Sequence, residues 1–417
     1  MYFQALFSAM HTVFWITFAL LFYLYAGYPL FLWMLARWFG RPVRKGTTGQ
    51  KCSVVISAYN EARTLPGKLR TLLSGRNGDC VEEVLIGSDG SDDGTEQAVE
   101  RVGDDRIRVV RFDRRRGKPS VLNDLVPQCR ADVVVLTDAR QELSDRALVS
   151  LLANFSDEQV GVVSGELIFR RSDNGSSTAE GMDAYWRYEK FIRRAEGRFR
   201  SVPGATGALY AIRRDLFTPM HPEILLDDVA VPMQAILKGH RCVFEEAAIV
   251  YDVPSQTGKA EGIRKRRTIA GNIQLAACYP AFLNPWRNPI WFEFVSHKML
   301  RLVSPFLLMV LLAANGGIVG RQYSVSSVQC SVFHSPSLLL NTEHCLLNTA
   351  YWISLVAQAL FYLLAAIGLR PGLRSILTAV PAMFLRLNII TMLAWADALL
   401  RRYRVDWRRI PGEGNPC

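Results

Sequence analysis

The chain has 417 residues, of which half are hydrophobic and 21% are charged, and its net charge is +11. It is too hydrophobic for a disordered chain and too charged for a bundle made only of membrane helices. Eight cysteines in a chain of this length exclude a small disulfide-stapled scaffold. The sequence has no Cys-x-x-Cys pair, which argues against a zinc ribbon or a thioredoxin-like site.

A long uncharged run near the N-terminus predicts a first membrane span. Residues Thr12–Ala36 carry no charge, and a spanning helix needs about 20 apolar residues. The run is too long for the core of a signal peptide, and no basic segment precedes it. Arg37 and further basic residues follow, and positive charge beside a span stays in the cytoplasm. We therefore expect the N-terminus outside and the chain from about residue 40 inside.

The middle of the chain predicts an α/β domain from Lys51 to about Pro254. Short apolar, β-branched runs alternate there with helix-like stretches, the first of which begins at AYNEARTL. The expected strands are Cys52–Ser57, Val81–Ile86, Ile107–Phe112 and Asp132–Thr137. Strands that each precede a helix indicate βα units on a parallel sheet, whose ligands bind at the carboxyl ends of the strands.

Polar residues gather at these expected strand ends. They are Asn60, Glu61, Ser88, Asp89, Lys118 and Asp138. Several acids beside the basic loop Arg114–Lys118 suit a nucleotide diphosphate, because the cations offset phosphate charge. Any single Asp after a strand is about equally well explained as a helix cap. Four such ends with this spacing are much harder to explain as caps alone.

Three further apolar runs lie towards the C-terminus: Leu302–Gly320, Leu346–Leu369 and Ser375–Leu400. Four spans from an outside N-terminus would leave the strongly basic tail outside, against the positive-inside rule. Either the last run lies along the interface or re-enters, or the first run is not a simple span. Arg386, which interrupts the last run, favours the former.

Cys330 and Cys345 fall in a polar stretch that we expect to form a loop outside the cytoplasm. A disulfide is permitted there. Two unrelated thiols explain the pair equally well.

Seven segments follow one another along the chain: VVISAYNEARTL, LIGSDGSDDGT, RRGKPSVLND, VVVLTDAR, PGATGALYAIRR, LLDDVAVPMQAILKG and GIRKRRTIAGNIQ. In this order they resemble the successive motifs of processive membrane glycosyltransferases of family 2, which include cellulose, hyaluronan and poly-N-acetylglucosamine synthases. Seven matches in order make this resemblance specific. It covers about residues 50–300 and implies a GT-A fold, the α/β fold of nucleotide-diphospho-sugar transferases.

The resemblance assigns roles to residues that match the motifs. Asp228 would be the general base, with the adjacent Asp227 as the alternative base or a metal neighbour. The stretch Gly204, Ala205, Thr206 and Gly207 would form the acceptor-side loop. Donor-nucleotide contacts would come from Ala58, Tyr59, Glu61, Asp89, Lys118, Asp138, Arg264 and Arg267. Asp138 would also hold a divalent cation, Mg²⁺ or Mn²⁺.

Three positions depart from the family pattern. Arg140 stands where a second metal-binding acid is usual, and a guanidinium cannot ligate Mg²⁺ or Mn²⁺. Asp138 could hold the ion with donor phosphates and another acid, which we favour; Arg140 could take over part of the ion's charge; or the donor could bind poorly. Thr268 replaces a Trp that stacks near the acceptor sugar, and Ser88 replaces the first acid beside Asp89.

We therefore expect four regions: an N-terminal transmembrane segment (1–46), a cytosolic GT-A domain (47–256), amphipathic interface helices with the diphosphate motif (257–300), and a C-terminal transmembrane region with a basic tail (301–417). The expected protein is a multi-pass enzyme of the cell (inner) membrane. It would transfer sugar from a nucleotide sugar, with a preference for uridine, to a glycan at the cytosolic face. Inversion follows from a single in-line displacement.

Other interpretations remain open. A polymer synthase extrudes its chain through its own spans, and a homo-oligomer would complete a thin channel, whereas transfer to a lipid-linked acceptor needs none. A non-catalytic homologue acting as a scaffold would explain the three departures. Nucleic-acid binding rests only on the net charge and is not expected. The aromatic residues Tyr185, Trp186, Tyr188 and Phe191 would either stack on sugar or, as we prefer, pack against the protein.

Overall fold

The computed structural model describes residues 2–46, 49–170, 178–252, 258–332, 342–370 and 375–400. The chain divides into two compact units. The first comprises Met1–Leu30, Ser176–Tyr188 and Leu300–Leu393, and the second comprises Phe31–Gly175, Glu189–Met299 and Ala394–Cys417.

In the described part of the second unit, eight strands form one sheet in the order β3-β2-β1-β4-β7-β6-β8-β5. Their bounds are β1 Cys52–Ala58, β2 Val81–Asp89, β3 Ile107–Phe112, β4 Val133–Thr137, β5 Glu142–Leu143, β6 Val160–Phe169, β7 Leu209–Arg213 and β8 Arg241–Asp252. The first four confirm the strands expected from the sequence, and β1 to β4 pair in parallel. Their carboxyl ends therefore meet at one edge of the sheet.

The other half of the sheet changes direction. Strand β7 runs antiparallel to both β4 and β6, while β6 and β8 are parallel. Because β7 lies between two strands of the opposite direction, its amino end meets the carboxyl end of β4. The loop before β7, which holds the expected acceptor-side glycines, is thereby brought beside Asp138.

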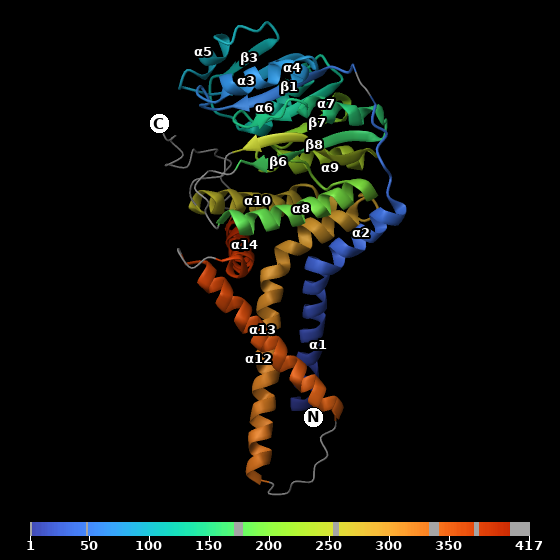
Figure 1. Cartoon of the computed structure of the whole chain (residues 1–417), viewed down its shortest axis with the longest axis vertical. Helices are drawn as coiled ribbons and strands as arrows, with labels where there is room; N and C mark the ends of the chain where they lie inside the picture. Colours follow the sequence, from blue (N-terminus) through green and yellow to red (C-terminus); the bar gives the residue numbers. More distant parts are fainter. Residues whose placement is uncertain are drawn as a thin grey trace. The chain divides into compact units, whose positions relative to one another are not determined.

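Helices cover both faces of this sheet (Figure 1). One face packs on α3 Leu65–Leu73, α5 Thr95–Glu100 and α7 Ala147–Leu152. The other packs on α6 Lys118–Leu125, α9 Asp227–Leu237 and α10 Gly258–Cys278. Neighbouring residues of a strand point to opposite faces, so Val54 and Val55 of β1 belong to different cores. Burial on both faces explains why β4 and most of β1 are continuously apolar.

The helix after β1 begins later than the sequence predicts. Asn60 has φ of +56°, a left-handed conformation that Asn tolerates better than most residues. The side-chain NH₂ of Asn60 donates to the Asp92 carboxylate at 2.8 Å. The side-chain oxygen of Asn60 accepts from the Asp92 backbone N–H at 3.0 Å. The segment therefore forms a turn pinned to the loop after β2, and α3 starts only at Leu65.

Long apolar helices lie towards both ends of the chain. They are α1 Tyr2–Phe22, α2 Tyr28–Phe39, α12 Leu300–Val332, α13 Thr342–Gly368 and α14 Ile376–Leu399. The described residues contain four helical stretches long and apolar enough to cross a membrane: Phe7–Phe39, Trp291–Tyr323, Thr349–Gly368 and Leu377–Leu399. These four confirm the four expected apolar runs. The short helices α4 Gly75–Gly78 and α11 Trp291–Phe294 and the longer α8 Thr178–Phe199 complete the set of α-helices in the described residues.

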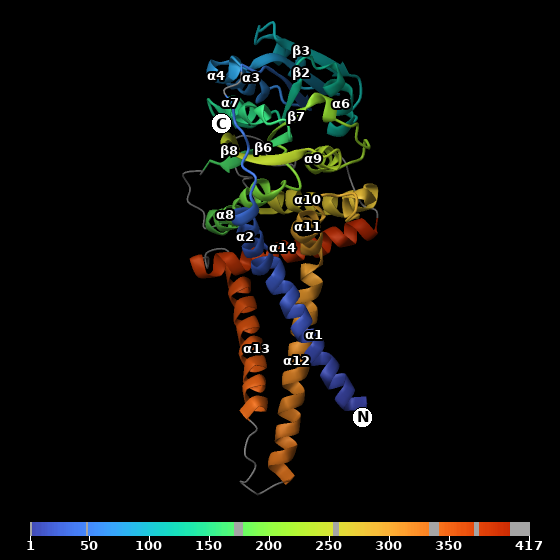
Figure 2. The ribbon, with the colours of Figure 1, turned by 90° about the vertical axis from the view of Figure 1, so that its right-hand side faces the viewer.

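Polar side chains join helices within the first unit. The Tyr351 hydroxyl lies 2.6 Å from His11 Nδ1 and accepts a hydrogen bond from Trp15 Nε1 at 2.8 Å. Ser304 of α12 donates to the Asn388 amide oxygen on α14 at 2.8 Å. Helix α14 runs crosswise to α13 (Figure 2), the orientation expected of a helix that lies along an interface.

Two further expectations concern the same unit. Tyr188 donates to the backbone oxygen of Tyr25 at 3.0 Å, and the guanidinium of Arg301 lies 5.4 Å from its ring. These contacts favour packing over a sugar platform for Tyr188. Helices α12 and α13 extend over Cys330 and Cys345, so neither residue lies in a loop, contrary to expectation. Their side chains, and so their pairing, lie outside the described residues.

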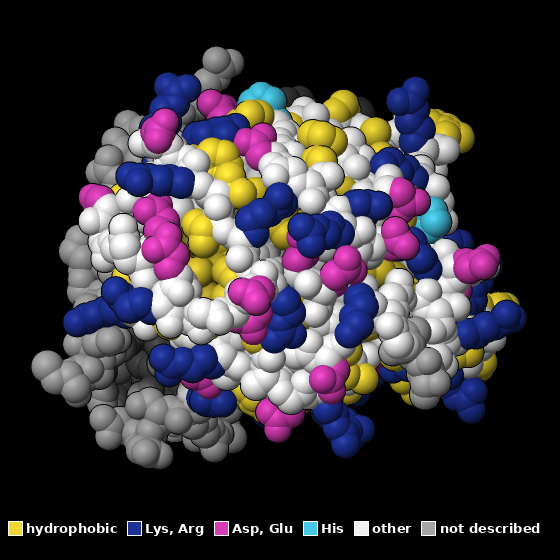
Figure 3. Space-filling view, turned by 90° about the horizontal axis from the view of Figure 1, so that it is seen from above, with side chains coloured by type: hydrophobic (Ala, Val, Ile, Leu, Met, Phe, Trp, Pro, Cys, Tyr) yellow, Lys and Arg dark blue, Asp and Glu magenta, His cyan; other side chains and the backbone are white. Residues whose placement is uncertain are grey.

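Charges on the second unit are of both signs. Figure 3 shows Lys and Arg side chains interspersed with Asp and Glu over the face seen from above. On this face the basic side chains are therefore not gathered in one patch.

Candidate active site

A buried ammonium joins two carboxylates at the edge of the sheet. Lys118 Nζ lies 2.9 Å from Asp138 Oδ1 and 3.2 Å from Asp227 Oδ2. Lys118 opens α6 after Gly117, whose φ of +89° favours glycine; Asp138 follows β4, and Asp227 opens α9. Burial alone would lower the pKa of Lys118, but the carboxylates raise it well above its usual value. Lys118 therefore stays charged, and three expected site residues are neighbours.

The Asp138 carboxyl is held ionised. Burial would raise its pKa, but Lys118, followed by Arg140 and Lys68, lowers it below the usual value. On the other side of Lys118, Asp227 accepts a further hydrogen bond from the Tyr210 hydroxyl at 3.4 Å. Lys118 and Tyr210 thus both hold the Asp227 carboxylate in place.

Asp228 has different surroundings, although it is the next residue. Burial first and the charge of Asp227 second raise the pKa of Asp228 to about 6, against the opposing charges of Lys118 and Lys298. A carboxylate with a pKa near neutrality is suited to general base catalysis. Both acids lie in the first turn of α9, where the helix dipole favours negative charge.

The acceptor-side loop packs directly on Asp228. The Ala205 backbone N–H donates to the Asp228 backbone oxygen at 2.7 Å, and Gly204 has φ of +135°, which side chains rarely allow. A Cβ atom on Gly207 would lie 2.9 Å from Asp228 Oδ2. Glycine is therefore required at Gly207 to leave room for the carboxylate.

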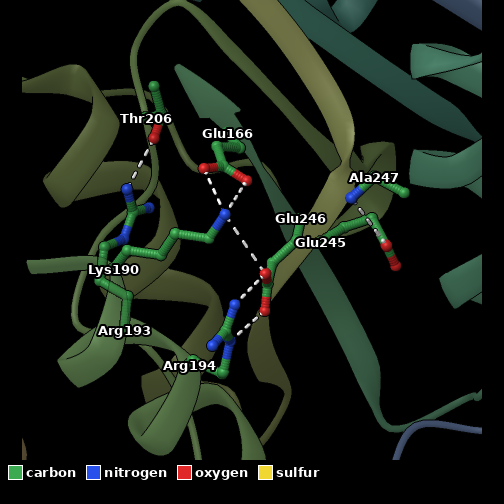
Figure 4. Close-up of polar contacts among 8 residues, drawn as sticks. All are labelled: Glu166, Lys190, Arg193, Arg194, Thr206, Glu245, Glu246 and Ala247. Carbon is green, nitrogen blue, oxygen red and sulfur yellow. Dashed lines mark hydrogen bonds and ion pairs between the residues drawn. The ribbon is translucent and has the colours of Figure 1, made fainter. Parts of the chain in front are cut away.

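Arg193 of α8 hydrogen-bonds to this loop and to strand β6. Its guanidinium donates to the hydroxyls of Thr206 and Ser164, both at 2.7 Å, and the Thr206 N–H donates to Ser164 Oγ at 2.9 Å. Figure 4 shows Arg193 beside Lys190, which donates to both oxygens of Glu166 at 2.6 and 2.7 Å. Arg193 could not be identified from the sequence, because no motif surrounds it.

The basic helix α10 contributes one arginine to the cluster. Burial lowers the pKa of Arg267 below its usual value. The negative charges of Asp138, Asp228 and Asp227 oppose this effect. Arg264, one turn earlier, lies 3.9 Å from Glu261. Arg267 is therefore placed among the acids as expected, whereas the recorded ion pair of Arg264 is local to α10.

Asp89 organises the arginine-rich loop. Its two carboxylate oxygens accept backbone hydrogen bonds from Arg116 at 2.7 Å and from Gly117 at 2.8 Å. Asp89 is buried, and these bonds fix the loop that leads into Lys118. The structure thus gives Asp89 a positioning role in addition to the donor contact expected from the resemblance.

The remaining residues that the resemblance assigns to the nucleotide lie at the end of β1. Ala58 is buried opposite Ser88, and the Arg115 guanidinium lies 4.0 Å from the Tyr59 ring centroid. Arg115 Nη2 is buried and has no hydrogen-bond partner among the described residues. Glu61 is bonded locally to the Thr64 hydroxyl. Tyr59 and Arg115 therefore place an aromatic ring and a cation together beyond the carboxyl end of β1.

The residues around Arg140 form a second charged group. Arg140 Nη2 lies 3.4 Å from Asp252 Oδ2, to which Gln141 also donates at 3.2 Å. Lys68 donates to Thr137 Oγ1 at 2.9 Å. Burial lowers the pKa of Lys68 to about 7, although Asp138, Asp252 and Glu142 oppose this. The sequence did not reveal Lys68 or Asp252, because neither residue is part of a matched motif.

These residues do not fit an ion site built by the protein itself. Asp138 Oδ1 is bonded to Lys118, and a cation occupies the position of the second acid. Within the ranges that the structure describes, no group of three or more His, Cys, Asp or Glu side chains is arranged to hold a metal ion. Any ion at Asp138 would have to draw most of its oxygen ligands from the donor.

Comparisons with known proteins give a consistent result. Residues 53–218 match the family model for glycosyl transferase family 2. The glycosyltransferase AglD of Haloferax volcanii is 33% identical over 131 residues, 30% of this chain and 21% of that protein. The poly-beta-1,6-N-acetyl-D-glucosamine synthase of Staphylococcus aureus is 22% identical over 243 residues, 57% of this chain and 58% of that protein. The chain thus spans a minor part of one relative and just over half of the other.

The fold has a solved counterpart. The mannosyltransferase PcManGT of Pyrobaculum calidifontis, determined in complex with GDP-Man and Mn²⁺, matches with a TM-score of 0.67 and 20% identity, covering 94% of this chain and 99% of that one. At this identity the likeness concerns the fold. The chain therefore contains a glycosyl transferase family 2 domain with a GT-A-like sheet, and helices apolar enough to cross a membrane lie towards both ends of its sequence.

Proposed function

We propose that the protein transfers a sugar, with inversion, from a nucleotide-sugar donor to a growing glycan at the cytosolic face of the cell membrane. By resemblance the donor is a uridine diphosphate sugar and the product an extracellular or capsular polysaccharide. The observation that carries the proposal is the placement of Lys118, Asp138, Asp227, Asp228 and Arg267 around one strand end.

The charges of these residues match the needs of the reaction. The acceptor oxygen forms a bond to the anomeric carbon while the bond to the diphosphate oxygen breaks, and the bonding electrons leave with the diphosphate. Lys118 and Arg267 are fixed cations able to stabilise the charge that develops there. The acceptor hydroxyl proton passes to Asp228, which is better suited than Asp227 because Asp227 is held by Lys118 and Tyr210.

The divalent ion remains a prediction of the resemblance. The similar solved structure contains Mn²⁺ and GDP-Man. In this chain, Asp138 is the carboxylate that would hold such an ion with the donor phosphates. None of the steps above passes through the ion.

Transfer of a single sugar to a lipid-linked acceptor is the second candidate. Thr268 in place of the family's Trp favours it, because an aromatic platform for a long sugar chain is then missing at that position. The catalytic residues would be the same in both cases. Only the acceptor and the size of the product would differ.

A panel of nucleotide sugars tests the proposal. Full-length protein in detergent or lipid would be incubated with labelled UDP- and GDP-sugars and membrane extract, and the products would be sized. We expect one donor to be consumed with release of its nucleoside diphosphate and formation of a glycan or glycolipid. The Asp228→Asn protein is the matched control. Nucleotide binding without transfer from any donor would favour the scaffold interpretation and overturn the proposal.

A further inference from the structure

We infer that this chain holds the donor diphosphate with its own cations in place of a divalent ion, with Arg140 as a phosphate-binding residue beside Lys118. The inference rests on the proposed function and concerns the same site. It replaces the expectation that Asp138 acts as a metal ligand.

The space between the two carboxylates already contains a cation. Lys118 Nζ lies within 3.2 Å of both Asp138 and Asp227 and is buried. An ion chelated by these two acids would have to displace the ammonium, which forms no other close ion pair in the described residues. The ammonium supplies the positive charge that an ion would otherwise bring.

Arg140 supplies a second charge at the position where metal-dependent relatives have an acid. The guanidinium has five N–H donors, and its recorded contact is the single 3.4 Å approach to Asp252. The planar arrangement of these donors matches two phosphate oxygens at once. Arg140 is also near enough to Asp138 to help keep that carboxyl ionised.

The arrangement also accounts for Asp252 and Gln141. Asp252 is buried at the end of β8 and contacts Arg140 and Gln141 together. Asp252 thus holds the Arg140 guanidinium, and Gln141 in turn holds Asp252. The guanidinium of Arg140 is therefore preorganised to bind an anion and would repel a divalent cation.

During transfer the diphosphate gains one negative charge as the bond to the anomeric carbon breaks. That charge would be shared by Lys118, Arg140 and Arg267. The proton from the acceptor passes to Asp228, so the step needs no further reactant.

The test measures binding of the nucleoside diphosphate and sugar transfer on full-length protein, in EDTA and in Mn²⁺. We expect wild type to change by less than about threefold between the two conditions. Arg140→Ala should weaken binding by about tenfold in both, the scale of one charge-assisted hydrogen bond. Arg140→Asp restores an Asp-x-Asp pair and should make binding at least about tenfold tighter in Mn²⁺ than in EDTA. Arg101→Asp, an exposed residue, controls for loss of surface charge.

The outcomes separate this inference from the proposed function. Loss of wild-type binding and transfer in EDTA, with recovery in Mn²⁺, would overturn the inference and leave the transferase intact. The inference would also be contradicted if Mn²⁺ changed nucleoside diphosphate binding by the same factor in wild type and in Arg140→Asp. Binding without transfer in either condition would count against the proposed function instead.

Discussion

The two halves of the sheet serve the site in different ways. In β3-β2-β1-β4 all neighbours are parallel, and each strand end delivers a residue in chain order: Tyr59 after β1, Asp89 at β2, Lys118 after β3 and Asp138 after β4. In β7-β6-β8-β5 the pairing is mixed, because β7 and β5 run antiparallel to their neighbours while β6 and β8 are parallel. There the site depends on a loop, two helices and contacts between distant segments.

Under the proposed function, the parallel half would bind the charged diphosphate and the mixed half would accept the proton. The parallel half provides fixed cations and the loop that Asp89 ties down, which are features for holding a diphosphate. The mixed half provides Asp228, whose pKa is raised, and the glycine loop packed on it. Variants in the first half should therefore change donor binding, and variants in the second half should change turnover or acceptor use.

The largest effect is expected from Asp228→Asn. The amide cannot accept the acceptor proton, so the transfer rate should fall by about two to four orders of magnitude. Nucleotide binding, measured by calorimetry, should stay close to that of wild type because the parallel half is untouched. Asp227→Asn should instead weaken donor binding, because Asp227, although it opens α9, pairs with Lys118 of the parallel half. Near-normal turnover by Asp228→Asn would remove Asp228 from the role of base.

Gly207→Ala should give the next largest effect. The added Cβ would lie 2.9 Å from Asp228 Oδ2, so the carboxylate must move. We expect turnover to fall by roughly 10- to 100-fold, since a displacement of about 1 Å can cost this much. Gly67→Ala, which meets nothing within 4 Å, is the control and should retain full transfer. Equal turnover in both variants would contradict the contact between loop and base.

Arg193→Met should change the acceptor side alone. Its loss removes two hydrogen bonds that fix Thr206 and Ser164, so we expect KM for the acceptor to rise by roughly tenfold, with donor binding unchanged. Arg194→Met is the neighbouring control, because Arg194 is exposed and pairs with Glu246 instead of with the loop. A rise in donor KM instead would show that the two halves are not separate.

The smallest expected effect is on stability. Asp89→Asn turns one acceptor into a donor facing a backbone N–H, and a buried group left unsatisfied costs about 1–3 kcal/mol. Thermal unfolding should show this loss, together with weaker nucleotide binding. Asp132→Asn, at a side chain that is 90% exposed, should stay within about 0.5 kcal/mol of wild type. An unchanged melting temperature for Asp89→Asn would rule out the positioning role.

The same comparison explains what the sequence could predict. Motifs of the parallel half follow strands directly, so Asp138 and Lys118 were identified with the right neighbours. The reversal at β7, the brace from Arg193 and the buried Lys68 could not be identified, because they depend on contacts between residues far apart in the chain. The late start of α3 depends on the left-handed Asn60 and its partners in another loop.

The pH dependence of turnover tests the central claim most directly. Asp228 must be ionised to accept a proton, and its pKa is raised to about 6, so the ionised fraction falls as the pH drops through that value. We predict that kcat decreases about tenfold per pH unit below about 6 and is level above it. Asp228→Asn should lack this limb. A wild-type rate that is flat from about pH 4.5 to 8 would contradict the account.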